Sequence, residues 1–228
     1  MGRCPSCGAE TPEGTTFCAR CGARLDLPRI AGPIGASQGL WYQNFYKIRK
    51  KVVAIADQYW IEDGRGTQLG YSRQKLLRIK EDIRIFADDS MTREVFRIKQ
   101  ENIGDAWGTF AVVDSATEAC VGKLRRKALM SGMFADEYFI LDPMNQQIGR
   151  VSERAGRATM RRWMPGGGLV PEQVVVEFYG KEVAEIKQQF KVIGDIWEVD
   201  CSRIPANFDR RTLLACMLMM GMVERDRK

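Results

Sequence analysis

The chain has 228 residues, of which 45% are hydrophobic and 28% charged, and its formal net charge is +6. This length and hydrophobic content allow one sizeable domain beside a small module, and the mild basic charge is compatible with an anionic partner. The chain has no histidine, which excludes Ser-His-Asp and Cys-His catalysis, histidine-containing zinc hydrolase sites and histidine acid–base chemistry.

Two Cys-x-x-Cys pairs near the N-terminus form the strongest motif. They supply Cys4, Cys7, Cys18 and Cys21. The spacing is typical of a tetrahedral thiolate site, so we predict that the four cysteines bind one structural Zn²⁺, which has no position left for a substrate. One alternative is a pair of disulfides in a secreted module, which we do not expect because no signal peptide precedes Cys4. A redox-active pair fits less well, since all four cysteines stand at zinc spacing.

Composition divides the chain into three predicted parts. Residues 1–26 form the zinc ribbon, which is too small to fold without its metal. Residues 27–40 are rich in Gly and Pro and lack a sustained apolar period, which indicates a flexible linker. Residues 41–228 form the main domain.

The main domain alternates apolar and polar residues with period two, as half-buried β-strands do. Three segments share one template, in which a strand ends in Asp, a short turn follows, and the returning strand carries an apolar residue before Gly. They are Tyr59–Gly70, Phe110–Gly122 and Phe139–Gly149. Further hairpins are predicted at Ile83–Ile98 and Val174–Ile186. A meander this long must close or stack to protect its edge strands.

The pattern changes near the C-terminus. Residues Leu213–Val223 are apolar on every side of a helix that Asp209 is placed to cap. This run would span about 16 Å, roughly half of the hydrocarbon layer of a bilayer. A helix of this kind is buried all round, so we predict a closed β-barrel threaded by the helix.

The main domain contains, in this order, the segments Tyr46–Lys51, Tyr59–Asp63, Gly70–Leu77, Lys80–Ile85, Gly122–Lys127, Phe139–Asp142 and Asp209–Arg211. Taken together, they resemble the LURP-one-related family of the tubby C-terminal-like and phospholipid-scramblase superfamily. The N-terminal part resembles the short bacterial-type zinc ribbon in Cys4–Gly8 and Phe17–Gly22. The resemblance implies a mainly β fold, namely a closed antiparallel barrel of about twelve strands around a central hydrophobic C-terminal helix. It also implies binding of phosphoinositide headgroups by basic surface residues, as in tubby domains, or the lipid movement associated with scramblases.

Two basic clusters are candidates for binding anions or lipid headgroups through charge-assisted hydrogen bonds. The first consists of Lys123, Arg125, Arg126 and Lys127. The second consists of Arg154, Arg157, Arg161 and Arg162. The alternative is a solvated outer face of the barrel, on which such residues also protect strand edges. The binding hypothesis is favoured if both clusters meet on one surface.

A third basic run, Lys47–Lys51, follows Trp41, Tyr42, Phe45 and Tyr46. Basic residues beside aromatics can bind single-stranded nucleic acid or a membrane interface. More often, such aromatics cover the core face of a first strand.

These features favour a non-enzymatic binding module in the cytoplasm, peripheral at the membrane, with no transmembrane helix. We expect the barrel to bind anionic phospholipid headgroups or an acidic partner, and the ribbon to contact protein or nucleic acid. No small-molecule substrate is indicated, and Cys120, Cys201 and Cys216 stand singly in apolar surroundings, as buried packing residues do. The alternatives are a scramblase-like phospholipid-handling protein and a nucleic-acid-associated regulatory protein.

Overall fold

A computed structural model describes residues 2–3, 10–12, 41–52, 56–75, 82–101, 108–126, 137–154, 173–190, 194–205 and 208–223. The predicted linker, 27–40, lies outside these residues.

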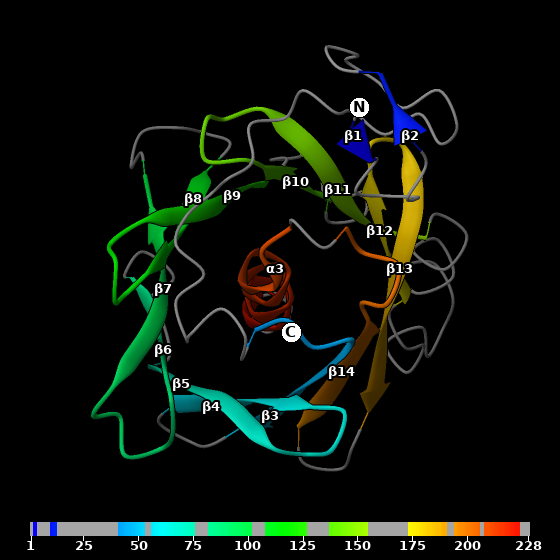
Figure 1. Cartoon of the computed structure of the whole chain (residues 1–228). Helices are drawn as coiled ribbons and strands as arrows, with labels where there is room; N and C mark the ends of the chain where they lie inside the picture. Colours follow the sequence, from blue (N-terminus) through cyan, green and yellow to red (C-terminus); the bar gives the residue numbers. More distant parts are fainter. Residues whose placement is uncertain are drawn as a thin grey trace.

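Twelve antiparallel strands close into a barrel in the order β10-β11-β12-β13-β14-β3-β4-β5-β6-β7-β8-β9, which Figure 1 shows end-on. The strands are β3 (Phe45–Val52), β4 (Ala56–Asp63), β5 (Gln68–Lys75), β6 (Ile83–Phe86), β7 (Glu94–Gln100), β8 (Thr109–Asp114), β9 (Cys120–Arg126), β10 (Glu137–Leu141), β11 (Gln147–Glu153), β12 (Gln173–Phe178), β13 (Lys181–Phe190) and β14 (Asp195–Asp200). The prediction of a mainly β, closed antiparallel barrel is confirmed.

The closing strand, β14, is not among the hairpins that the sequence predicts. It pairs with β13 on one side and with β3, the first barrel strand, on the other, so that Ile196 faces Arg49 and Asp200 faces Phe45. This pairing joins the two ends of the domain. A local alternation of apolar residues marks a strand but does not identify so distant a partner.

The Asp that ends each template strand organises the turn after it. Asp63 accepts hydrogen bonds on Oδ1 from the backbone N–H groups of Arg65 and Thr67, both at 2.8 Å. Asp142 accepts from Met144 and Gln146 in the same way, at 2.9 and 2.8 Å. The repeated Asp is thus explained by local turn chemistry, because its side chain satisfies N–H groups that no strand partner reaches.

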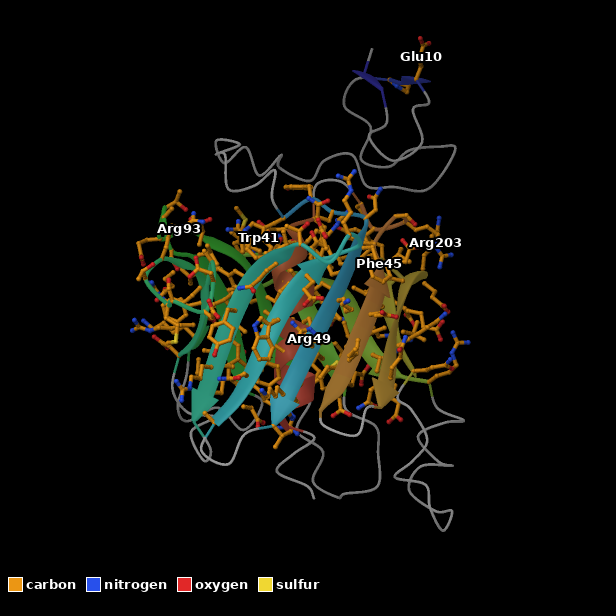
Figure 2. The ribbon with its side chains drawn as sticks, turned by 90° about the horizontal axis from the view of Figure 1, so that it is seen from below. Glu10, Trp41, Phe45, Arg49, Arg93 and Arg203 are labelled. Atoms are coloured by element: carbon orange, nitrogen blue, oxygen red, sulfur yellow. The ribbon has the colours of Figure 1, made fainter. Side chains whose placement is uncertain are left out.

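All hairpin turns that follow β4, β6, β8, β10 and β12 lie at one end of the barrel, because the direction of the strands alternates. The chain also enters β3 and leaves β14 at this end. Figure 2 views the barrel from the side and places Trp41, Phe45, Arg93 and Arg203 there. We name this end the turn rim; it comprises residues 41–44, 64–67, 87–93, 115–119, 142–146, 179–180 and 201–205.

Helix α3 (Arg210–Val223) runs through the centre of the barrel. Its side chains from Leu213 to Met219 are all at most 4% exposed, and they pack against the inward-facing residues of the strands. The prediction of a helix buried on every side is confirmed. In the part of the chain that the structure describes, no helix has the length and apolar character needed to cross a membrane.

The helix approaches β9 so closely that one strand position has no room for a side chain. A Cβ built on Gly122 would overlap Oγ1 of Thr212 in the first turn of α3 and lie 3.1 Å from its Cγ2. The glycine of the second template segment is therefore required by the central helix.

We expect Gly122→Ala to destabilise the protein by about 1–3 kcal/mol, because the added methyl group must displace α3 or β9. Thr212→Ala alone should cost little, since Oγ1 of Thr212 is buried without a hydrogen bond. The double variant should recover most of the loss in urea unfolding. Strictly additive effects of the two substitutions would contradict this account of the contact.

Candidate functional site

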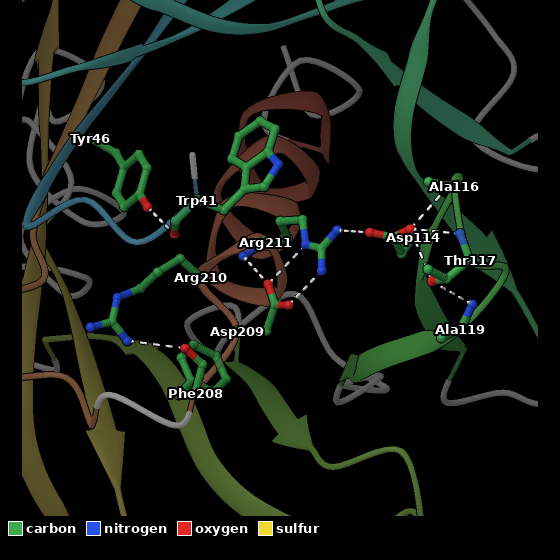
Figure 3. A network of polar contacts seen from close by, with 10 residues as sticks. All are labelled: Trp41, Tyr46, Asp114, Ala116, Thr117, Ala119, Phe208, Asp209, Arg210 and Arg211. Carbon is green, nitrogen blue, oxygen red and sulfur yellow. Dashed lines mark hydrogen bonds and ion pairs between the residues drawn. The ribbon is translucent and has the colours of Figure 1, made fainter. Parts of the chain in front are cut away.

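The N-terminal end of α3 is held by a buried ionic cluster, which Figure 3 shows in detail. The guanidinium of Arg211, 1% exposed, contacts Asp114 at the end of β8 and donates to both carboxylate oxygens of Asp209, at 3.0 and 2.7 Å. Asp209 also accepts the backbone N–H of Arg211 at 3.0 Å, so it is the N-cap that the sequence predicts. The cluster joins the helix start to the barrel wall.

The C-terminal end of α3 is held by Lys50, whose side chain points into the barrel. Its Nζ donates to the carbonyl oxygen of Gly221 at 2.7 Å and lies 3.4 Å from the carboxylate of Asp57. A cation is favourable there, since the last carbonyl groups of a helix carry partial negative charge. One member of the third basic run therefore has a structural contact.

The rest of that segment divides between core and surface. Trp41 and Tyr46 are buried in the core, as the alternative for this run predicts. Lys47 and Arg49 lie on the outer wall, where each pairs with Glu62, at 2.9 and 2.8 Å.

The carboxyl group of Asp114 is held in its charged form. Burial alone would raise its pKa, but hydrogen bonds from Arg211 and from Thr117 bring the pKa below its ordinary value. A carboxyl group whose pKa is lower in the folded state stabilises the protein above its unfolded pKa, near 4, and this contribution is lost as the pH falls through the folded value.

We expect Asp114→Asn to destabilise the protein by on the order of 3 kcal/mol at neutral pH, because Arg211 loses one of its two buried counter-charges. The variant should also lose less stability than the wild type between about pH 5 and pH 2. Denaturant unfolding at neutral and acidic pH measures both effects. An equal loss on acidification in the two proteins would show that Asp114 does not carry this contribution.

The described members of the two predicted basic clusters have contacts within the barrel. Lys123 is 8% exposed and pairs with Glu101 at 2.8 Å, and Nε of Arg125 donates to Oγ1 of Thr109 at 3.3 Å. Arg154 pairs with Glu182 at 3.2 Å, and Arg126 is half-buried at the end of β9. These contacts compete with an external anion. Lys127, Arg157, Arg161 and Arg162 lie outside the described residues, so whether the two clusters form one surface stays a prediction.

The turn rim gathers exposed apolar side chains, of which the sequence analysis named only Tyr42. Five large hydrophobic residues are exposed in the described part of the chain, and four of them lie at the turn rim. These four are Tyr42, Met91, Met144 and Tyr179, at 40%, 38%, 69% and 52% exposure, and the fifth, Val52, lies at the opposite end of the barrel. Position in a turn gives no apolar period, so the sequence pattern could not single out Met91, Met144 and Tyr179. Their common location follows from the alternating strand direction.

Two of these residues have an unusual backbone. Met91 and Tyr179 have φ of 56° and 48°, in the left-handed region that favours Gly and Asn. Such a conformation costs on the order of 1 kcal/mol for a bulky residue and tends to persist where it serves a function. Asn at either position would relieve this cost.

Three arginines lie among these side chains. Arg65, Arg93 and Arg203 are exposed, and no described carboxylate forms an ion pair with them within 4.0 Å. Asp63, Asp88 and Asp200 in the same turns accept hydrogen bonds from their own backbone. These bonds contribute to a pKa below the ordinary value for each Asp, with the side-chain hydrogen bond from Ser90 leading for Asp88.

The cysteines of the barrel do not offer a reactive thiolate. Cys201 and Cys216 are fully buried, and burial raises the pKa of Cys201 to about 12 and that of Cys216 higher still. Burial also raises the pKa of Cys120, which is half-buried. All three thiols are therefore protonated at neutral pH.

The predicted zinc ligands Cys4, Cys7, Cys18 and Cys21 lie outside the described residues. In the described part of this region, β1 (Gly2–Arg3) pairs with β2 (Glu10–Thr11) in antiparallel register, and Cys4 and Cys7 come between these two strands in the sequence. Four thiolates in two Cys-x-x-Cys pairs are a donor set suited to Zn²⁺, which would supply the folding energy of the segment and no open coordination position.

Comparison with known proteins supports the N-terminal assignment. A zinc-ribbon domain model matches residues 3–25, which include all four cysteines. No curated protein matches the chain. Among solved structures, the X-ray structure of a protein from Arabidopsis thaliana matches with a TM-score of 0.46 and 11% identity, over 81% of this chain and 94% of that one.

We expect removal of zinc by a strong chelator to unfold the residues before Leu27 and to leave the barrel intact, because the barrel has its own core. Calorimetry should show an unchanged main transition, while amide exchange in the N-terminal segment becomes fast. Loss of both parts in one cooperative transition would contradict independent folding of the ribbon.

Proposed function

We propose that this protein is a non-enzymatic binding module, in which the barrel binds anionic phospholipid surfaces and the zinc ribbon contacts protein or nucleic acid. The fold suits this role, because α3 fills the barrel and the rim turns stand on rigid strands. The absence of histidine and the protonated state of the described thiols agree with a role other than catalysis.

The observation that supports the lipid proposal most directly is that exposed Tyr and Met side chains lie together on the turn rim. The β12–β13 turn, with Tyr179, and the β6–β7 turn, with Met91, are six strand positions apart in the ring of twelve, and so lie on opposite sides of the barrel. Met144 extends from the β10–β11 turn. Side chains spread around a ring can all touch a flat surface, and Tyr and Met suit the boundary between headgroups and acyl chains.

The arginines of the turn rim supply the preference for anionic lipid. Arg65 and Arg93 belong to the β4–β5 and β6–β7 turns, and Arg203 follows β14, so these cations lie at the same end as the apolar side chains. This end also carries the carboxylates Asp88, Asp89, Glu118 and Asp142. A cation close to an anionic membrane contributes about 1 kcal/mol at moderate ionic strength. Several weak contacts of this kind give reversible, salt-sensitive attachment.

The resemblance to LURP-one-related proteins agrees with this proposal. We propose that the main domain is a tubby-like barrel, on the basis of the ordered sequence segments and the central helix. In this proposal the lipid surface lies at the turn rim.

Vesicle flotation tests the proposal. We expect binding to vesicles that contain phosphatidylglycerol, little binding to phosphatidylcholine alone, and weaker binding at about 200 mM than at about 50 mM salt. Met91→Asn/Tyr179→Asn should weaken binding by about tenfold or more, since two apolar contacts are lost. Because Asn tolerates the left-handed backbone, this variant should keep or raise the thermal stability.

Val52→Asn is the matched control, because Val52 is exposed to a similar degree at the opposite end of the barrel. It should bind vesicles as the wild type does. Equal binding by the wild type and the rim variant would refute the turn rim as the lipid surface, and no binding to anionic vesicles at either salt would refute lipid binding altogether.

A further inference from the structure

The outer wall of β3–β7 carries a row of cationic side chains that crosses the strands. Lys51 faces Gln58, Gln58 faces Arg73, and Arg84 faces Arg97 across neighbouring strands. The pairing of Tyr71 with Phe86 places Arg73 opposite Arg84. We name this set the cationic row: Lys51, Arg73, Arg84 and Arg97.

Like charges directly opposite each other on neighbouring strands repel, so this arrangement is unfavourable for the barrel alone. Glu94 offsets part of the repulsion, because it lies 3.4 Å from Arg84 and 3.3 Å from Arg97, and Glu118 also pairs with Arg97. Lys51 and Arg73 are exposed, and no described carboxylate forms an ion pair with either of them. The row therefore keeps an excess of positive charge.

A row of mostly aromatic residues runs beside the cationic row, two residues nearer the turn rim on each of the strands β3–β6. Arg49 faces Trp60, Trp60 faces Tyr71, and Tyr71 faces Phe86. Trp60 and Phe86 are half-buried, whereas Tyr71 is buried next to Trp60, with ring centroids 5.5 Å apart. The guanidinium of Arg49 lies 4.8 Å from the Trp60 ring centroid, so this ring already accepts a planar group. Figure 2 views β3 and β4 from outside, with Arg49 on β3 labelled near the middle of the picture.

We infer that these two rows form a binding track for single-stranded nucleic acid, with phosphates on the cationic row and bases against Trp60 and Phe86. From Lys51 on β3 to Arg97 on β7 the row crosses four inter-strand steps, about 19 Å. That length suits an extended polyanion better than one small headgroup. Positive charge that follows a backbone, next to aromatic rings on which bases stack, is the usual means of binding single strands without sequence preference.

This inference is independent of the proposed lipid function, because the cationic row lies on the side of the barrel and shares no residue with the turn rim. It also differs from a role of the ribbon, since every residue in it belongs to the barrel. The two surfaces can thus be tested with separate variants of the full chain.

Fluorescence anisotropy with a labelled oligothymidylate tests the inference. We expect the full chain to bind it at about 50 mM salt and to weaken steeply by about 200 mM. Arg73→Ala/Arg84→Ala should lower the affinity and reduce the slope of log K against log salt by about 1.4, as expected for two lost phosphate contacts on a single strand. Trp60→Leu should lower the affinity by about 5- to 100-fold and leave this slope unchanged, because stacking releases no counterions.

The matched control is Arg150→Ala/Lys187→Ala, which removes two exposed cations from the outer wall of β11 and β13 on another side of the barrel. It should bind the oligonucleotide as the wild type does, and thermal melting should confirm that every variant is folded. Met91→Asn/Tyr179→Asn should also bind it normally, which separates this track from the lipid surface.

Four results would overturn the inference. The first is that the wild type does not bind the oligonucleotide at low salt, and the second is that Arg150→Ala/Lys187→Ala loses as much affinity as Arg73→Ala/Arg84→Ala. The third is that Arg73→Ala/Arg84→Ala binds the oligonucleotide as the wild type does. The fourth is that this variant keeps oligonucleotide binding but loses binding to phosphatidylglycerol vesicles. The third would place oligonucleotide binding outside the cationic row, and the fourth would make the row a lipid site.

Discussion

The architecture depends on one constraint, which is that a helix apolar on every side must be removed from water on every side. A single sheet face or a neighbouring helix covers only one side of α3, whereas a closed barrel covers all of it. The contact at Gly122 and the inward alternation of the strands follow from this constraint. So does the lack of free sheet edges in the barrel, because closure pairs every strand on both sides.

Charged contacts at both ends of α3 complement this nonspecific apolar packing. Hydrophobic burial alone does not fix the position of a helix along the barrel axis or its rotation about that axis, because many positions bury a similar apolar area. Arg211 with Asp114 and Asp209 at one end, and Lys50 with the carbonyl oxygen of Gly221 at the other, each need one particular position. Buried ion pairs add little net stability, but a broken one is costly, so they select a single arrangement.

Because the interior is occupied, the functional hypotheses concern the outside of the barrel. The turn rim combines exposed Tyr and Met side chains with arginines, and the wall of β3–β7 combines a cationic row with aromatics. Both surfaces contain residues that are not the residue types most favourable for folding at their positions. Met91 and Tyr179 occupy backbone conformations that suit Asn, and Arg84 stands opposite Arg97.

The sequence by itself determined the elements whose signals are local. These are the period-two strands, the Asp-led turns, the all-apolar helix with its Asp209 cap, and the two Cys-x-x-Cys pairs that match a zinc ribbon. Only the tertiary structure decided what depends on distant pairing, such as the closure of β14 on β3, the burial of Lys123 and the inward position of Lys50. The same holds for the meeting of turn residues at one rim and of cations from successive strands in one row. Periodicity reports which face of a strand is buried, whereas register and ring order decide which exposed side chains become neighbours.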